Sequence, residues 1–189
     1  MSSSRRVHHS YEDYLELLQR TETKLEYCDG EIFAMAGGTL AHAELGAAMV
    51  ALLHPALAGR CRVFSSDAKV RIEATDLTTF PDGSVVCGEA QASPIDRHAI
   101  TNPSLVFEVT SRSTEDYDRG EKLSHYKQLP ALRAVCLLSH RRPRITVVTR
   151  DDDHWTVREF RSGEAVTLEH PALTVAVDDV YRGVTLDVE

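Results

Sequence analysis

The sequence predicts an α/β fold in which a mixed central β-sheet is flanked by helices. Residues 80–87 and 105–110 have the composition of short buried strands. Residues 134–138 are continuously apolar, as in a central strand that is covered on both faces. Helical segments lie between these strands, and neither an internal repeat nor a low-complexity linker divides the chain. One domain with a mixed sheet accommodates this order.

Length and composition limit the class of protein. A chain of 189 residues with 42% apolar content fits one globular domain, which we place at residues 10–189 after a flexible tail at 1–9. No apolar run approaches the roughly 20 residues needed to span a bilayer, and the start lacks the apolar middle of a signal peptide. We therefore expect a cytoplasmic protein with no membrane partner.

The cysteines and the net charge restrict the function further. Cys28, Cys61, Cys87 and Cys136 match no zinc-ligand spacing, and we interpret them as small buried hydrophobes in a reducing compartment. The net charge of -8 argues against a protein that coats nucleic acid nonspecifically, but it does not exclude a nuclease. Residues 133–150 contain five arginines and no acid. That local basic segment is either a solvated hairpin, a surface for nucleic acid, or a dimer contact.

The first third of the chain predicts a helix, a hairpin and a second helix. Residues 10–20 form an amphipathic pattern with Ser10 as N-cap and Asp13 as its capping-box acid, and Tyr14, Leu17 and Leu18 share one face. Two strand-like segments within 24–35 flank Asp29-Gly30, a strong hairpin signal. The following core helix is predicted at 39–57 from the spacing of Leu45, Met49, Leu52 and Leu53.

The remainder of the chain predicts strands with one further helix. Strands are expected at 62–65, 69–73, 80–87 and 105–110, with a surface loop at 88–104. A helix capped by Ser113 should run to about Leu129 and stop at Pro130. After the strand at 134–138, we expect an antiparallel meander of three strands at 144–150, 154–160 and 164–168.

Two carboxylates stand in the predicted buried strands. Asp82 and Glu108 each occupy a position where an apolar residue would be expected, and an uncompensated buried carboxylate costs several kcal/mol. If the strands are neighbours, both can bind one divalent ion, for which Mg2+ fits best and Mn2+ is a possible substitute. Asp82 has an alternative explanation as a turn residue after proline. Glu108 is hard to explain by packing.

Lys122 is the candidate cation of this site. In the predicted helix it shares a face with Asp118 and Tyr126, so that its ammonium can hold an attacking water or offset charge on phosphate oxygens. An exposed ion pair between Asp118 and Lys122 is the alternative.

Three further residues are candidates from their positions. Glu31, after the hairpin turn, could supply a third carboxylate, and Glu26 is an alternative for that role. The alternative for Glu31, which the sequence favours, is an exposed acid that pairs across the hairpin. His42, early in the core helix, could contact phosphate or orient a water, or it could be a locally bonded helix-start residue.

The order of these motifs resembles a known family. Asp29-Gly30-Glu31, His42, Pro81-Asp82, Glu108-Val109-Thr110-Ser111 and Asp118-Arg119-Gly120-Glu121-Lys122 with Tyr126 are similar to the Uma-type family of restriction endonucleases, within the PD-(D/E)XK nuclease superfamily. The resemblance extends from about Tyr11 to Val184.

The resemblance implies a restriction-endonuclease-like fold, Mg2+-dependent cleavage of DNA, and Asp82 and Glu108 as metal ligands. Thr110 stands where the superfamily pattern has its lysine, and Lys122 looks like a relocated lysine. Two other departures are Gly83-Ser84, where relatives have larger apolar residues, and Arg112, where a proline is usual.

Two function hypotheses follow. The first is a Mg2+-dependent endonuclease with Asp82, Glu108, Lys122, Glu31 and His42 as its catalytic residues, acting on DNA, with a homodimer suited to cutting both strands. The alternative is a noncatalytic DNA-binding protein of nuclease fold, associated with mobile elements, which the acidic net charge and Thr110 favour. A serine hydrolase using Ser111 or Ser113 lacks the Gly-x-Ser-x-Gly elbow.

Overall fold

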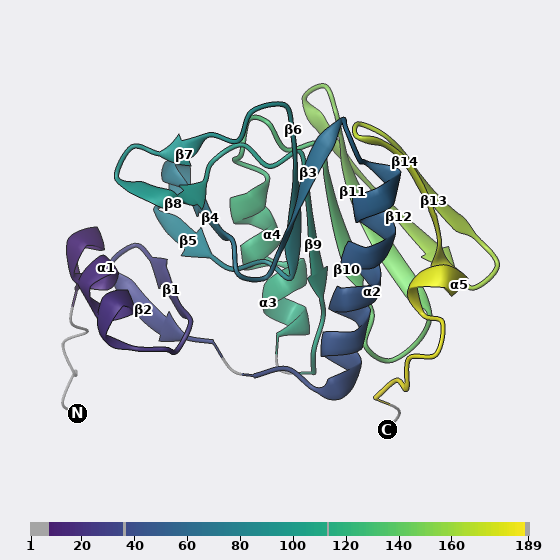
Figure 1. Ribbon diagram of the computed structural model, residues 1–189, viewed down its shortest axis with the longest axis horizontal. Helices are drawn as coiled ribbons and strands as arrows, with labels where there is room; N and C mark the ends of the chain where they lie inside the picture. The colour runs from purple at the N-terminus through teal and green to yellow at the C-terminus, as the bar shows by residue number, and fades with distance from the viewer. Residues whose placement is uncertain (1–7, 36, 113, 188–189) are drawn as a thin grey trace.

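The computed structural model describes residues 8–35, 37–112 and 114–187. Within these residues the chain forms two six-stranded sheets and a two-stranded sheet, with the helices packed around them (Figure 1). The proposed tail at residues 1–9 lies mainly outside the described residues, and the division into tail and domain stays a prediction.

The central sheet has the strand order β12-β11-β10-β9-β6-β3. Its strands are β3 (Cys61–Ser65), β6 (Gly83–Cys87), β9 (Leu105–Val109), β10 (Ala134–Leu138), β11 (Arg144–Asp151) and β12 (His154–Arg161). Strands β9 and β10 are parallel, whereas the other neighbours are antiparallel. The sheet is therefore mixed, as the sequence predicts, and all five residues of β9 and of β10 are buried.

A second sheet lies beside the central one, with the order β2-β1-β5-β4-β8-β7. Its strands are β1 (Leu25–Cys28), β2 (Glu31–Ala34), β4 (Lys69–Ile72), β5 (Leu77–Thr79), β7 (Ala92–Ser93) and β8 (Asp96–Ile100). Helix α1 (Tyr11–Arg20) packs against β1, and the 3-10 turn η1 (Glu73–Thr75) joins β4 to β5.

The two faces of the central sheet carry different layers. Helix α2 (Leu40–Ala56) covers one face together with β13 (Ala165–Glu169), β14 (Ala172–Ala176) and α5 (Val177–Val180). Helices α3 (Glu115–Arg119) and α4 (Glu121–Tyr126) and the second sheet lie on the other face. Residues of β9 alternate between the layers: Phe107 packs in the α2 core, and Val106 packs in the α4 core. Glu108 therefore points toward α4.

Several predicted elements are present with their predicted signals. Ser10 and Asp13 form the capping box of α1, and Asp29 and Gly30 make the hairpin turn with positive φ values of 44° and 82°. Thr39 caps α2, from which Leu45, Met49 and Leu53 enter the core. Leu17 is an exception, because it is exposed on α1 and does not face the core.

Other expectations are wrong. The predicted loop at 88–104 contains β7 and β8, and β5 and β14 were not predicted. Asp82 precedes β6 and is not inside a strand. The third strand of the expected meander leaves the central sheet and pairs with β14. A bent backbone at Gly120 divides the expected helix at 113–129 into α3 and α4. The predicted cap, Ser113, lies outside the described residues.

Cys61 and Cys87 are joined by a disulfide. They stand directly opposite each other in the antiparallel pair of β3 and β6, which places two thiols in contact. The interpretation of all four cysteines as reduced, buried hydrophobes is therefore wrong for this pair. Cys28 and Cys136 are free thiols, and Cys136 is buried in the core. In the described part of the chain, no helix has the length and apolarity to cross a membrane.

Gly83 allows the closest packing between β6 and β9. It pairs with Phe107, and a Cβ at position 83 would lie 2.3 Å from the Phe107 ring and 3.0 Å from the Phe64 carbonyl oxygen. The aromatic ring therefore fills the space that a larger residue at position 83 would need. We expect Gly83→Ala to lower the free energy of unfolding by about 1–3 kcal/mol, because the buried ring cannot move without repacking the core. Urea denaturation measures this change.

Gly46→Ala is the matched control. Gly46 lies inside α2, and a Cβ there would meet nothing within 4 Å. This substitution should raise the free energy of unfolding by about 0.5–1 kcal/mol, because alanine favours the helix. Equal effects of the two substitutions would contradict the packing argument.

Candidate active site

Asp82 joins the start of β6 to the end of β9. Its Oδ2 accepts a hydrogen bond of 2.7 Å from the backbone N–H of Val109, and it lies 3.2 Å from Nε2 of His42 on α2. The side chain is 15% exposed. The hydrogen bond to Val109 places the Asp82 carboxylate beside Glu108, the preceding residue. The Asp82 charge also acts on the Glu108 carboxyl, so the two predicted metal ligands are close enough to interact.

Glu108 lies in the middle of the molecule, with 4% of its surface exposed. Its Oε1 accepts a hydrogen bond of 2.5 Å from the Tyr126 hydroxyl and lies 2.8 Å from the Lys122 ammonium. Both partners come from α4. One helix thus supplies both the cation and the neutral donor that stabilise this buried carboxylate.

Burial raises the pKa of the Glu108 carboxyl to about 7, and Asp82 and Asp118 add to that rise. The Lys122 ammonium opposes it. Burial is the largest cause of the rise, and the acidic neighbours are a smaller one. Glu108, Glu26 and Asp118 all act on the same lysine, Lys122. Such a site gains from any further positive charge, which is what a divalent ion would bring.

Lys122 is buried, with 6% of its side chain exposed. Burial lowers the pKa of its ammonium, but Glu108, Glu26 and Asp118 together raise it above its ordinary value. Lys122 is therefore a fixed cation that donates hydrogen bonds. Asp118 is also buried and accepts a hydrogen bond of 2.7 Å from the Thr114 hydroxyl. The interpretation of Asp118 and Lys122 as an exposed surface pair is wrong for this reason.

Glu26 and Tyr126 belong to the same cluster, although neither was in the predicted set of catalytic residues. Glu26, from β1, lies 3.8 Å from Lys122 and accepts hydrogen bonds from the Thr79 hydroxyl and the Phe80 N–H. Tyr126 was detectable from its spacing, because it follows Lys122 by four residues on one helix. The sequence offers Glu26 only as an alternative to Glu31, and the pairing of β1 with β5 brings it here.

His42 and Glu31 have different positions relative to this cluster. The hydrogen bond to Asp82 raises the pKa of His42, against the opposing effect of burial. His42 thus reaches the site from the α2 side of the sheet. Glu31 begins β2 and lines a neighbouring cavity together with Glu26. Its role as a metal ligand stays a prediction, as do the roles of the other four residues.

The chemistry of these donors fits a magnesium ion. Among the described residues, the contacts to the two carboxylates fall on Oδ2 of Asp82 and Oε1 of Glu108, so Oδ1 and Oε2 are the atoms to consider as ligands. The same residues contain no group of three His, Cys, Asp or Glu side chains placed to hold a metal. Mg2+ needs no such cage, because it commonly binds one or two carboxylates and keeps waters.

Thr110, at the position of the superfamily lysine, is buried outside this cluster of charges. Its hydroxyl lies 3.3 Å from the Leu138 carbonyl oxygen, to which it donates, and 3.3 Å from Nδ1 of His140. The cation at Glu108 comes instead from α4. The role of Lys122 as a relocated lysine stays a prediction.

The family model of Uma2, described as "Putative restriction endonuclease", matches residues 11–184. The chain belongs to this family. The match contains Asp82, Glu108 and Lys122 as well as both sheets. It agrees with the resemblance drawn from the motifs.

Two relatives from Synechocystis sp. are similar over most of their length. The protein named "Uncharacterized protein slr1290" is 37% identical over 179 residues, which cover 92% of this chain and 92% of the relative. "Uncharacterized protein sll1609" is 28% identical over 159 residues, with 83% of this chain and 89% of the relative covered.

A solved structure shows the same fold. The crystal structure of "a putative nuclease belonging to DUF820" from Anabaena variabilis superposes with a TM-score of 0.73 and 16% identity, over 92% of this chain and 98% of that one. The Uma2 chain therefore has the restriction-endonuclease-like α/β fold that its sequence predicts. At this identity the likeness concerns the fold alone.

The hydrogen bond from Tyr126 to Glu108 can be tested by its contribution to the stability of the folded protein. We expect Tyr126→Phe to lower the free energy of unfolding by about 1.5–3 kcal/mol, because the acceptor is a carboxylate. Tyr14→Phe is the matched control: Tyr14 is also fully buried, but its hydroxyl donates to the neutral carbonyl of Leu25. That loss should be about 0.5–1.5 kcal/mol. Urea denaturation above the pKa of Glu108 compares them, and a smaller loss in Tyr126→Phe would contradict the assignment.

Proposed function

We propose that this protein is a Mg2+-dependent endonuclease that hydrolyses phosphodiester bonds of DNA. The observation that carries the proposal is the junction of β6 and β9, where Asp82 is fixed beside Glu108 and Lys122 pairs with Glu108. Two adjacent carboxylates and a buried cation are the groups that metal-assisted phosphodiester cleavage needs. Family membership supports the same reaction class.

Asp82 and Glu108 would hold the ion through Oδ1 and Oε2. When bound, Mg2+ supplies polarisation of the scissile phosphate and a water of lowered pKa. Lys122 is kept protonated by its acidic neighbours, so it cannot take a proton from that water. Its task is to donate hydrogen bonds to phosphate oxygens as their charge grows. Tyr126 holds the Glu108 carboxylate in place for this arrangement.

His42 has a second positioning task. It is held by Asp82 and is 24% exposed, so one edge of the imidazole can meet a phosphate or a water. The raised pKa favours the protonated ring near neutral pH, and a protonated ring binds phosphate. Glu31 is assigned to the acidic wall next to the site.

The arginine-rich segment supports DNA as the substrate. Leu138, at the end of β10, pairs with Val109, so the turn after β10 lies at the same end of the sheet as the site. Arg141 and Arg142 are exposed on that turn. Arg133 and Arg150 lie instead at the opposite end of β10 and β11. The two turn arginines can therefore bind phosphates that flank the scissile bond on an otherwise acidic protein.

The cytoplasmic location, the homodimer and the substitution of Mn2+ for Mg2+ stay predictions. A noncatalytic DNA-binding protein, associated with mobile elements, is the second candidate. The observation in its favour is the absence of lysine at position 110, where the superfamily pattern has one. The experiments below separate it from the enzyme.

Loss of either predicted ligand should abolish metal-dependent nicking. We expect the wild type to nick supercoiled plasmid DNA with Mg2+ and to be inactive with EDTA. Asp82→Asn and Glu108→Gln should each reduce the rate at least about 100-fold, because each removes a charged ligand but keeps the shape and the hydrogen-bond acceptors. Gel analysis of time courses measures the rate.

Asp153→Asn is the control for the loss of one negative charge, since Asp153 is exposed on the turn between β11 and β12. Nicking that survives both site substitutions would remove the proposed site. A wild type that binds metal and DNA without nicking would favour the noncatalytic candidate.

Lys122 should act on the rate of cleavage. We expect Lys122→Gln to lower the nicking rate about 100-fold at saturating Mg2+, because the neutral amide still donates to Glu108 but brings no charge to the phosphate. Lys127→Gln, five residues further along and only partly buried, should leave the rate unchanged. Thermal unfolding of both variants checks that the fold persists. An unchanged rate in folded Lys122→Gln would exclude the proposed role.

A further inference from the structure

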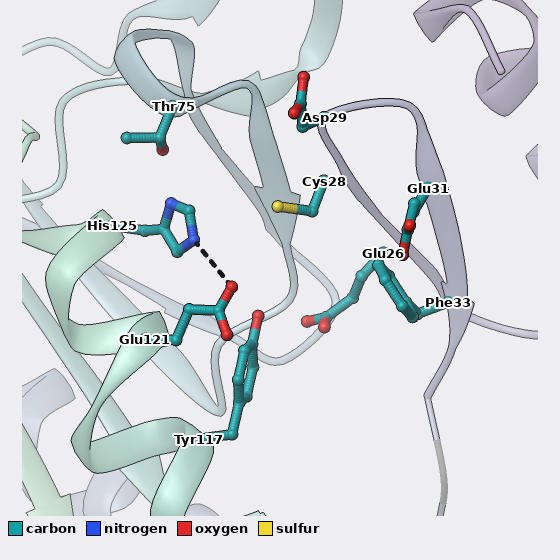
Figure 2. A pocket seen from close by; sticks show the side chains of 9 residues that line it. All are labelled: Glu26, Cys28, Asp29, Glu31, Phe33, Thr75, Tyr117, Glu121 and His125. Carbon is teal, nitrogen blue, oxygen red and sulfur yellow. Dashed lines mark ion pairs between the residues drawn. The ribbon is translucent and has the colours of Figure 1, made fainter. Parts of the chain in front are cut away.

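A cavity of about 760 Å³ adjoins the candidate active site. Glu26 belongs to both, because it pairs with Lys122 on one side and lines the cavity on the other. Strands β1 and β2 form one wall, and α3 and α4 form the opposite wall (Figure 2). The volume lies within the usual range of small-ligand sites, roughly 300–1,000 Å³. It is larger than one nucleobase requires.

The walls of the cavity exclude phosphate as an occupant. Glu26, Glu31 and Glu121 line it, and no arginine or lysine is among its lining residues in the described chain. Asp29 lines it too, so a phosphate would meet mostly like charge there. The carboxylates of the wall accept hydrogen bonds, so they fit organic cations or neutral ligands that offer N–H donors. Of these two classes, a DNA substrate contains the neutral one, because its bases are uncharged.

Polar and flat groups in the cavity point to the same class of ligand. Nδ1 of His125 and the hydroxyl of Thr75 are buried and have no hydrogen-bond partner among the described residues. Figure 2 shows the His125 ring, the Cys28 sulfur and the Tyr117 hydroxyl directed toward a common space. Buried polar atoms without partners cost about 1–3 kcal/mol each unless a ligand or water satisfies them. The Tyr117 ring adds a surface on which a planar group can stack.

We propose that the cavity receives a single unstacked nucleobase of the DNA substrate, with guanine as the preferred base. This inference rests on the proposed endonuclease function and names the part of the substrate that the protein reads. An extruded base is neutral, so it can enter an acidic cavity. The phosphates of the same nucleotide and its neighbours stay outside the cavity, where Arg141 and Arg142 can bind them. The shared residue Glu26 makes the cavity continuous with the cluster around Lys122.

Guanine is the preferred base because of its hydrogen-bonding edge. Its ring N–H and exocyclic amino group stand side by side and match the two oxygens of one carboxylate. Glu121 is the candidate acceptor, since its carboxylate is directed into the space between His125 and Tyr117. Thymine offers one N–H between two carbonyl oxygens, which a carboxylate repels. Adenine and cytosine offer an amino group beside an acceptor nitrogen.

Nucleoside binding tests the proposal without any cleavage. The probes are 2′-deoxyguanosine, 2′-deoxyadenosine, 2′-deoxycytidine and thymidine, titrated into the wild-type protein with EDTA and followed by NMR shifts. We expect 2′-deoxyguanosine to bind at least about fivefold more tightly than thymidine, as hydrogen-bond readout of a base edge requires. Tyr117→Ala and Glu121→Gln should each weaken 2′-deoxyguanosine binding about tenfold.

Glu12→Gln is the matched control for Glu121→Gln, because it removes an exposed carboxylate from α1, outside the cavity. It should leave binding unchanged. Equal binding of all four nucleosides, no binding at all, or binding unaffected by both cavity variants would overturn the proposal. Competition by Mg2+ for the same resonances would also overturn it and assign the cavity to a cation.

The result is independent of the nicking assay. Nucleoside binding by a protein that does not nick DNA would keep the cavity and reject the endonuclease. Nicking by a protein that binds no nucleoside would reject only the cavity. A 2-aminopurine base placed in a duplex gives a second readout: its fluorescence should rise when Glu108→Gln binds the DNA, and this rise should be lost when Tyr117→Ala is added.

Discussion

The buried ion pair between Lys122 and Glu108 is the interaction on which the rest of the site depends. Neither charge could remain inside the protein alone, because the desolvation of a single ion costs several kcal/mol. Pairing therefore fixes α4 over β9, with the Tyr126 hydroxyl completing the contact on Glu108. Because Glu26 and Asp118 lie close to the same lysine, the pair is also short of positive charge. A further cation, such as the proposed Mg2+, would offset this shortage.

The central sheet brings this pair to Asp82. Strands β6 and β9 are neighbours, and their close approach at Gly83 and Phe107 lets the carboxylate just before β6 reach the amide that follows Glu108. Glycine at position 83, where the resemblance implies a larger apolar residue, is thus explained by the Phe107 ring, which fills the space beside it. His42 approaches Asp82 from α2, so both layers that cover the sheet contribute to one site. Because the site lies at the ends of core strands and between two packed layers, the packing of the core keeps its side chains in position.

The differences between expectation and structure have local causes. Asp82 lies just before β6, as in the alternative of a residue at a strand start, and its side chain accepts the Val109 N–H. The expected long helix is divided because Gly120 has a backbone ψ of -94°, which lies outside the helical region. Lys122 therefore belongs to a separate short helix, α4. Part of the second sheet is not predicted because β7 and β8 are short and polar, and because β8 joins the sheet only through its pairing with the distant strand β4.

The sequence by itself determined the α/β class, the hairpin turn, the capped first helix, the central strands, and the carboxylates and lysine of the proposed site. These features are local, because they depend on residue spacing, caps and turn residues. Only the tertiary structure decided that Glu26 joins Lys122 and Glu108, that Cys61 meets Cys87, and that a cavity opens beside Glu26. Each of these depends on which strands pair and in which register. That choice is made by the burial of whole faces of the sheet, and no short segment of sequence contains it.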